Sequence, residues 1–127
     1  MIVGFTGTQV GMTPEQMAAV REALANPNTK EFHHGDCIGA DEEAHNIAVE
    51  FHIPIFVHPP VNPNKQAFCR EGFHFEPRPY LIRNHDIVDA CNLLIATPRG
   101  PEELRSGTWA TIRYASKIGR QLLIIEP

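Results

Sequence analysis

The sequence predicts an α/β protein, a three-layer sandwich in which helices cover both faces of a central parallel sheet of about five strands. Two observations support this prediction. Short apolar runs alternate along the chain with segments whose apolar residues recur at helical spacing. The apolar runs also lack the strict alternation of apolar and polar residues that a half-exposed strand shows, so these strands should be buried on both faces.

Five short runs rich in apolar or β-branched residues are the predicted strands. They occupy residues 2–6, 31–34, 53–57, 92–97 and 121–125. The second run is the least apolar, and its assignment depends on its position between the end of a helix and Gly35. In the third run Pro54 stands near the start, where a missing backbone N–H is tolerated.

Four segments have apolar residues at helical spacing, and start and stop signals bound them. They cover residues 14–25, 40–51, 80–91 and 108–117. Thr13, Pro14 and Gln16 predict the first helix start, because they combine a capping box with proline at the first helical position. Gly119 predicts the end of the last helix. The order of strands and helices is typical of a parallel sheet.

Residues 58–79 interrupt this alternation. Five prolines stand there, together with Phe68, Phe73 and Phe75. A long segment without regular elements inside a domain is usually functional, and this one is too aromatic for a typical disordered segment. We expect a flap over a binding site. Two alternatives stay open, a loop whose aromatic side chains plug the edge of the core and a surface that binds a partner.

The length of 127 residues, with 43% hydrophobic and 20% charged residues, predicts one domain over residues 1–127. No apolar run reaches the roughly 18 residues that a membrane-spanning helix needs, and the first residues do not resemble a signal peptide. The three cysteines, Cys37, Cys69 and Cys91, form no closely spaced pair, which is typical of a reducing compartment. We therefore expect a cytoplasmic protein that does not enter a membrane.

The charges favour a small anionic ligand. A net charge of −4 disfavours a protein whose main task is to bind the backbone of a nucleic acid. Most of the arginines lie in the second half of the chain, where lysine is almost absent. Arginine binds small anions through paired hydrogen bonds better than lysine does. Alternatively, these arginines are surface residues whose stems pack on apolar neighbours.

The stretch that best predicts a function follows the fourth strand. Ser106 can cap the last helix, and Gly107 leaves its start without a side chain. The first N–H groups of a helix have no partner within the helix and lie at the positive end of its dipole. Arg99 and Arg105 can add charged hydrogen bonds. We therefore expect a phosphate at the helix start Gly107-Thr108.

Three loops carry glycine and polar residues directly after predicted strands, and in a parallel sheet such loops converge on one edge. The predicted ligand-binding residues are Thr6, Gly7, Thr8, Gly35, Asp36, Gly39, Arg83, Asn84, Arg99, Gly100, Ser106, Gly107 and Thr108. The glycine fingerprint of dinucleotide-binding folds and the lysine-containing phosphate loop are both missing. We expect the ligand to be a nucleotide or a nucleotide derivative, such as a nucleoside monophosphate, an ADP-ribose-like molecule or a phosphoribosyl compound.

Four segments together carry a resemblance to known proteins. They are Gly4-Phe5-Thr6-Gly7-Thr8, the segment 34–44 with its Gly39-Ala40-Asp41 turn, Arg83-Asn84 and Gly107-Thr108. This set resembles the SLOG superfamily of Rossmann-like nucleotide-binding domains, which includes the Lonely Guy phosphoribohydrolases and the DNA-processing protein A core. The resemblance implies a Rossmann-like sheet of five parallel strands, a phosphate-bearing ligand over Gly107-Thr108, a site arginine at Arg83 and a homo-oligomer.

One position departs from the Lonely Guy pattern. That family's PGGxGTxxE motif aligns with Pro98-Arg99-Gly100 and Gly107-Thr108, and Thr111 then stands where the hydrolases have their catalytic glutamate. Threonine is not a carboxylate. The resemblance therefore favours a binding or sensing role, in a branch of the superfamily that lacks the glutamate.

Two other functions stay open. An enzyme would cleave the N-glycosidic bond of nucleoside 5′-monophosphates, with a different carboxylate in place of the glutamate. The candidate catalytic residues are Asp36, Asp41, Arg83, Glu102 and Glu103. Asp36 and Asp41 could also accept hydrogen bonds from ribose hydroxyls, and Asp41 could instead cap its helix. A single-stranded nucleic-acid binder would stack bases on the aromatic residues of 58–79, although the acidic charge disfavours it.

No metal and no cofactor is expected from the sequence. His33 and His34 are adjacent on a strand, so their side chains point to opposite faces and cannot chelate one ion together. Asp41 and His45 share one face of a helix, with Cys37 nearby in sequence. A further ligand at a characteristic spacing is missing.

Overall fold

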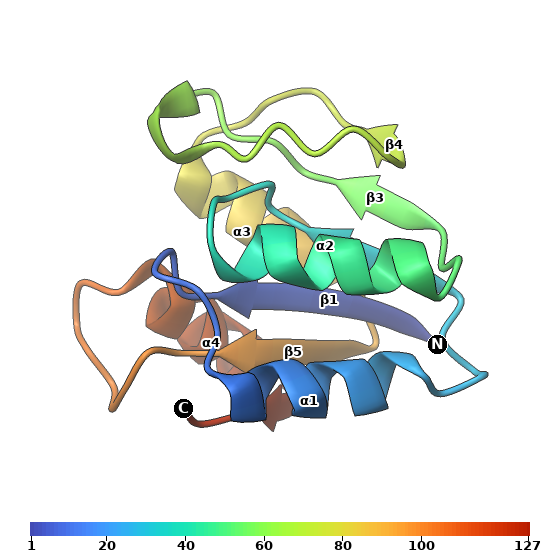
Figure 1. Cartoon of the computed structure of the whole chain (residues 1–127). Coiled ribbons are helices and arrows are strands. Elements are labelled where there is room, and N and C mark those ends of the chain that lie inside the picture. Colours follow the sequence, from blue (N-terminus) through green and yellow to red (C-terminus); the bar gives the residue numbers. More distant parts are fainter.

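The computed structural model describes all 127 residues and contains one sheet of six parallel strands (Figure 1). The strands follow the spatial order β4-β3-β2-β1-β5-β6. Their bounds are β1 (Ile2–Gly7), β2 (Glu31–His34), β3 (Ile55–Val57), β4 (Phe73–His74), β5 (Leu93–Thr97) and β6 (Gln121–Ile124). Every pair of neighbouring strands is parallel.

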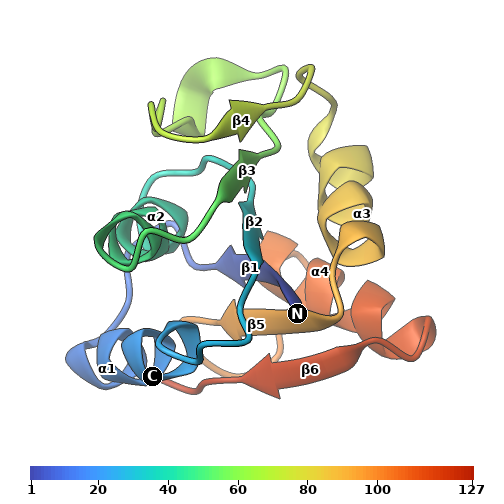
Figure 2. The ribbon, with the colours of Figure 1, turned by 90° about the vertical axis from the view of Figure 1, so that its right-hand side faces the viewer.

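Four α-helices form the outer layers. They are α1 (Pro14–Leu24), α2 (Ala40–Glu50), α3 (Tyr80–Ala90) and α4 (Gly107–Lys117). Figure 2 shows α1 and α2 on one face of the sheet and α3 and α4 on the other. The predicted three-layer α/β class with a central parallel sheet is therefore confirmed. A short 3₁₀ helix, Pro63–Lys65, lies in the long segment before β4.

The strand order reverses beside β1. The chain moves outward from β1 through β2 and β3 to β4, and then returns to place β5 on the other side of β1. The carboxyl ends of β1 and β5 lie at the same edge, where the loop after β5 leads into α4 (Figure 1). A reversal of this kind opens a crevice outside the strand ends, where ligands bind in such folds.

The prediction of about five strands misses β4. This strand has only two residues, Phe73 and His74, and both side chains are exposed at the edge of the sheet. It pairs with Phe56 and Val57 of β3. A two-residue edge strand leaves no periodic signal in a sequence, because it buries neither face. The third strand also begins later than predicted, at Ile55, directly after Pro54.

The helix starts predicted from local signals are confirmed. Thr13 and Gln16 form a capping box at the start of α1, and Ser106 Oγ accepts a hydrogen bond from Trp109 N (3.2 Å) at the start of α4. Gln16 also connects distant segments, since its side-chain nitrogen Nε2 donates to the carbonyl oxygens of Pro98 and Ile125, each at 2.8 Å. These bonds attach α1 to the chain beyond β5 and β6.

Two apolar clusters make up the core. The larger fills the space between the sheet and the α1–α2 layer, and the smaller lies under α3 and α4. Gly4 of β1 faces the smaller cluster, where an added Cβ would come within 2.8 Å of Cys91 Sγ. Glycine at this position therefore lets α3 pack closely on the central strand.

Residues 58–79 lie against the outer edge of the sheet. Phe75 stacks on His58 with ring centroids 4.5 Å apart, and Phe73 packs edge-on against Phe75 at 4.9 Å. Backbone hydrogen bonds join the segment to the loop after β2, among them Ala67 N to Asp36 O at 2.7 Å. Phe68, Phe73 and Phe75 are nevertheless all exposed, so these side chains are not buried in the core.

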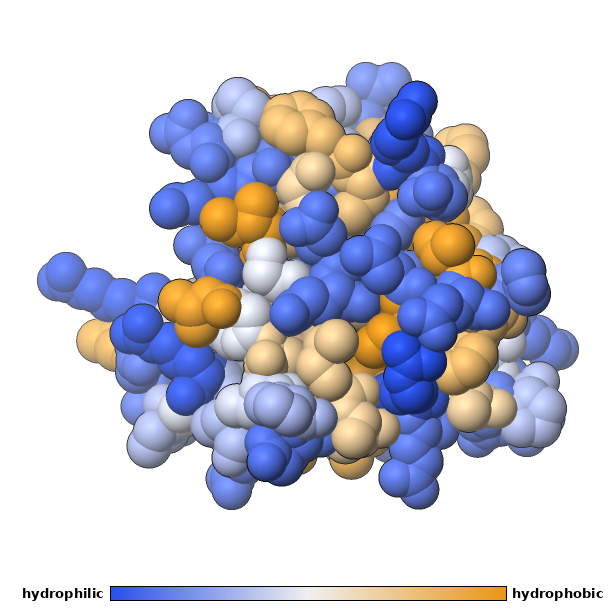
Figure 3. Space-filling model, viewed as in Figure 1, coloured by the Kyte–Doolittle hydropathy of each residue, from blue (hydrophilic) through white to orange (hydrophobic).

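No helix has both the length and the apolar character needed to cross a membrane. The face drawn in Figure 3 is mainly hydrophilic, and its strongly hydrophobic residues form separate small spots.

Candidate functional site

A cavity of about 500 Å³ opens at the carboxyl ends of β1 and β5. Four segments that are distant in sequence line it: the end of β1 with its loop, the loop from β2 into α2, the first turns of α3, and the loop that leads into α4. None of residues 58–79 lines the cavity, so the structure does not bring the predicted flap over it.

Most of the predicted site residues share this cavity. Those that line it are Thr6, Gly7, Thr8, Gly35, Asp41, Arg83, Asn84, Arg99, Ser106, Gly107 and Thr108. Glu103 and Arg105, also considered in the sequence, line it as well, whereas Asp36, Gly39, Gly100 and Glu102 do not. The sequence prediction missed other lining residues, namely Phe5, Gln9, Val10, Cys37, Tyr80 and Ile87. Each of these residues lies within or beside a predicted motif or shares a helix face with Arg83. That proximity is the sequence signal by which they could have been predicted.

The start of α4 faces the cavity with its backbone exposed. Ser106 caps the helix through Trp109 N, and an ideal Cβ built on Gly107 meets no atom within 4 Å. Thr111, at the position of the missing glutamate, is buried, and its hydroxyl donates to Gly107 O (2.9 Å). Thr111 does not line the cavity. Its hydroxyl supports the first turn, in which Trp109 N and Ala110 N donate to Ser106, while the N–H groups of Gly107 and Thr108 have no partner in the protein.

Arg99 and Arg105 lie at the mouth of the cavity. Arg99 contacts Glu103 at 3.4 Å, and both side chains are exposed. Arg105 also lines the cavity and forms no ion pair. An exposed ion pair contributes little stability. Arg99 can therefore exchange Glu103 for an anionic ligand at small cost.

Arg83 is a buried cation without a carboxylate partner. Its Nε donates to Asn84 Oδ1 (2.8 Å), and Nη1 donates to the carbonyl oxygens of Gly35 and His58. Nη2 contacts only the sulfur of Cys37, at 3.6 Å. Gly35 makes room for the guanidinium, because an added Cβ would lie 2.5 Å from Nη1. Buried charges are normally paired, yet no carboxylate lies within 4.0 Å of the Arg83 guanidinium, and Asp41 acts on it only from a longer distance.

Asp41 is a buried carboxylate with one unpartnered oxygen. It lies in the first turn of α2 with only 5% of its surface exposed. Its Oδ2 accepts a hydrogen bond from Cys37 N (3.1 Å), while Oδ1 has no partner. Burial raises the pKa of Asp41 to about 6, although the positive charge of Arg83 and the backbone N–H groups of Cys37 and Gly35 oppose this shift. The N-cap residue of α2 is Gly39, and the Asp41 side chain braces the loop before the helix.

Asp36, predicted as a ligand contact or general base, is engaged elsewhere. The residue is 1% exposed and has a left-handed backbone with φ of 60°. Its carboxylate accepts hydrogen bonds from Cys69 N and Gln66 Nε2, both at 2.9 Å. The side chain therefore fastens the long segment before β4 to the loop after β2. Gly39, with φ of 84°, lets this loop pass close to Gln9.

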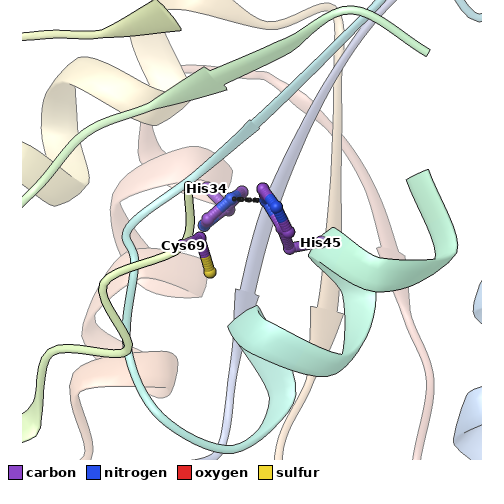
Figure 4. A group of neighbouring side chains, drawn as sticks. All are labelled: His34, His45 and Cys69. Atoms are coloured by element: carbon purple, nitrogen blue, oxygen red, sulfur yellow. Dashed lines mark hydrogen bonds between the residues drawn. The ribbon is translucent and has the colours of Figure 1, made fainter. Parts of the chain in front are cut away.

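Three side chains near this loop, His34, His45 and Cys69, form the one cluster that could offer metal ligands (Figure 4). His34 Nδ1 accepts a hydrogen bond from Asp36 N (3.0 Å), so His34 Nε2 carries the proton of the neutral ring. That proton is donated to His45 Nδ1 (2.9 Å), and His45 Nε2 then donates to Glu71 (2.9 Å). Burial lowers the pKa of His34, which keeps its ring neutral.

This chain of hydrogen bonds assigns every ring proton and leaves no nitrogen of His34 free for a metal. Burial also raises the pKa of the Cys69 thiol well above its usual range, so the sulfur keeps its proton. We interpret the cluster as a connection between β2, α2 and the long segment. His33, on the opposite face of β2 as expected, pairs with His58 at 2.8 Å instead.

We expect stoichiometric Zn²⁺ or EDTA to leave the midpoint of thermal unfolding unchanged, because a metal would have to displace protons that are already hydrogen-bonded. Differential scanning calorimetry with each addition checks this. A rise in the midpoint with Zn²⁺ that is absent in a Cys69→Ser variant would contradict the interpretation.

Neither a protein-family model nor a curated protein matches this sequence. Solved structures do match its fold. The molybdenum cofactor binding protein from the phototrophic bacterium Rippkaea orientalis aligns with 99% of this chain and 76% of its own, with a TM-score of 0.77 and 18% identity. The Moco carrier protein from Chlamydomonas reinhardtii aligns over the same shares, with a TM-score of 0.73 and 18% identity. At this identity the likeness establishes a common Rossmann-like α/β fold.

Proposed function

We propose that this chain binds a nucleotide or a nucleotide-like derivative in the cavity at the carboxyl ends of β1 and β5, with its phosphate at the start of α4. The observation that carries the proposal is the convergence at one cavity of an open helix start with three arginines, Arg83, Arg99 and Arg105. Helix starts and arginines both favour bound anions. The volume of about 500 Å³ suits a small molecule.

The chemical class of the ligand follows from the same cavity. Arg83 supplies a buried positive charge that forms no ion pair, and the start of α4 adds N–H donors for phosphate oxygens. Candidate ligands are nucleoside monophosphates, ADP-ribose-like molecules and phosphoribosyl compounds. The molybdenum cofactor is a second candidate, because two solved structures of the same fold carry its name.

Binding is favoured over hydrolysis because Thr111, at the position of the glutamate, is no carboxylate and does not line the cavity. Of the four carboxylates considered as replacements, only Asp41 and Glu103 line it. Glu102 pairs with Arg113 (2.9 Å) at the surface, and Asp36 is held by two hydrogen bonds away from the cavity. Incubation with nucleoside 5′-monophosphates and chromatography for free base tests hydrolysis, and release of base would favour the enzyme.

The ligand can be identified directly. Small molecules released from the purified, denatured protein are analysed by mass spectrometry, and the compounds found are added back in thermal unfolding. A ligand at 100 times its dissociation constant adds roughly 2.7 kcal/mol to the free energy of unfolding. If neither the released compounds nor the nucleotide panel shifts the midpoint, the proposed function fails.

The variant Gly107→Ala tests the phosphate position. The added Cβ meets no atom of the protein, so the fold should tolerate it, and alanine is a better helix former than glycine. The methyl group would stand where a phosphate approaches the backbone. We expect about tenfold weaker binding of phosphorylated ligands, measured by isothermal titration calorimetry.

Gly100→Ala is the matched control for this prediction. Its Cβ also meets no atom within 4 Å, and Gly100 does not line the cavity. The control should bind as the wild type does. Equal affinities of the two variants would contradict the assignment of the phosphate to the start of α4.

A further inference from the structure

We infer that Asp41 and Arg83 together bind the end of the ligand that lies away from the phosphate, through a group that carries a hydrogen-bond donor beside an acceptor. The inference rests on the proposed function and deepens it, since it specifies what the ligand offers besides phosphate. Two side-chain atoms carry it, Oδ1 of Asp41, which has no hydrogen-bond partner, and Nη2 of Arg83, which has only the weak acceptor Cys37 Sγ, and both residues line the cavity.

The first atom is a buried acceptor. Asp41 is nine-tenths buried or more, and Oδ1 lacks any partner although Oδ2 is bonded to Cys37 N. Leaving a buried polar atom unpaired destabilises a protein, and such an atom calls for an explanation. Because Asp41 lines the cavity, a ligand with an N–H or O–H group can provide the missing partner.

The second atom is a buried donor. Arg83 Nε and Nη1 are satisfied by Asn84, Gly35 and His58, whereas Nη2 has only the weak acceptor Cys37 Sγ at 3.6 Å. These bonds hold the guanidinium in place. A ligand carbonyl or hydroxyl oxygen would be a stronger acceptor for Nη2 than this sulfur.

The two side chains flank the same residue but do not form an ion pair. The sulfur of Cys37 accepts a hydrogen bond from Arg83 Nη2, and the backbone N–H of Cys37 donates one to Asp41 Oδ2. No N···O distance between Arg83 and Asp41 is within 4.0 Å. Different backbone groups hold the two side chains, so the acceptor and the donor stay apart.

This pairing selects the chemistry of the ligand group. A phosphate would attract Arg83 but repel Asp41, and an amine would do the reverse. A neutral group with an adjacent donor and acceptor satisfies both. Two common groups have this pattern, the lactam edge of an oxo-substituted base and the vicinal hydroxyls of a sugar.

The topology places this pair away from the phosphate. Asp41 follows β2 and the start of α4 follows β5, and β1 lies between these two strands. Two strand spacings amount to roughly 10 Å. A ligand that spans the cavity from α4 toward β2 therefore presents its sugar or base to Asp41 and Arg83.

The test compares ligands as well as variants. Affinities of guanosine, inosine and adenosine 5′-monophosphates and of their 2′-deoxy forms are measured by isothermal titration calorimetry with the wild type and Asp41→Asn. If the lactam is the group, the wild type prefers guanosine and inosine over adenosine monophosphate by about tenfold. If the hydroxyls are the group, it prefers the ribose form over the 2′-deoxy form by a similar factor.

Asp41→Asn should abolish the preference and keep the weaker, phosphate-dependent binding. Glu42→Gln is the matched control, because Glu42 lies in the same turn of α2, is exposed and does not line the cavity. This inference alone is overturned if the wild type binds nucleotides without either preference. It is also overturned if Asp41→Asn keeps the preference that the wild type shows. A wild type that binds none of the phosphorylated compounds overturns the proposed function itself.

Discussion

Replacing Asp41 with asparagine should stabilise the ligand-free protein by about 3 kcal/mol above pH 7. Burial raises the pKa of this carboxyl from an ordinary value of 3.8 to about 6, so folding favours its protonated form. The stabilisation from this preference is complete below pH 3.8 and is lost as the pH rises through about 6. Asparagine is neutral at every pH and avoids the loss.

The pH dependence distinguishes this cause from a general packing effect. Urea unfolding of the wild type and Asp41→Asn is measured at pH 5 and pH 8, and the difference at pH 5 should be about half of that at pH 8. Glu42→Gln, at an exposed position of the same turn, should show no such trend. A difference that is equal at both pH values would show that Asp41 ionises without penalty.

The same variant should therefore gain stability and lose ligand selectivity. A buried charge that destabilises the fold is typical of functional sites, because binding there requires groups that folding alone would not favour. A purely structural Asp41 would not give this combination, because its replacement would leave ligand preference unchanged.

Arg83→Met should lower the free energy of unfolding by about 3 kcal/mol or more. Methionine fills much of the volume of the arginine stem but donates no hydrogen bond. The buried carbonyl oxygens of Gly35 and His58 would lose their Arg83 donor, and so would the partly buried side chain of Asn84. Urea unfolding at pH 7 measures the loss.

Arg78→Met is the control for this prediction. Arg78 forms an ion pair with Asp86 at 2.9 Å, but its side chain is half exposed, so its replacement should cost less than about 1 kcal/mol. Gly35→Ala should resemble Arg83→Met, since its Cβ would lie 2.5 Å from the guanidinium. Equal effects of Arg83→Met and Arg78→Met would show that the buried hydrogen bonds contribute little.

Local signals in the sequence were sufficient for the fold class and for most of the cavity lining. Strand and helix periodicity, the caps at Thr13 and Ser106, and glycine or polar residues after strands depend on neighbours within a few positions. Parallel topology then brings such loops to one edge, whatever their distance in sequence. The same reasoning could not find β4, because a two-residue edge strand has no pattern of its own.

The sequence by itself thus determined the layers, the edge of the sheet at which the cavity lies and the open helix start at Gly107. Only the tertiary structure decided between the two aspartates that follow β2. Asp36 receives its partners from Gln66 and Cys69, about 30 residues further along the chain, whereas Oδ1 of Asp41 receives none. A carboxylate's role depends on which groups surround it, and that is set by contacts between segments that no local pattern records.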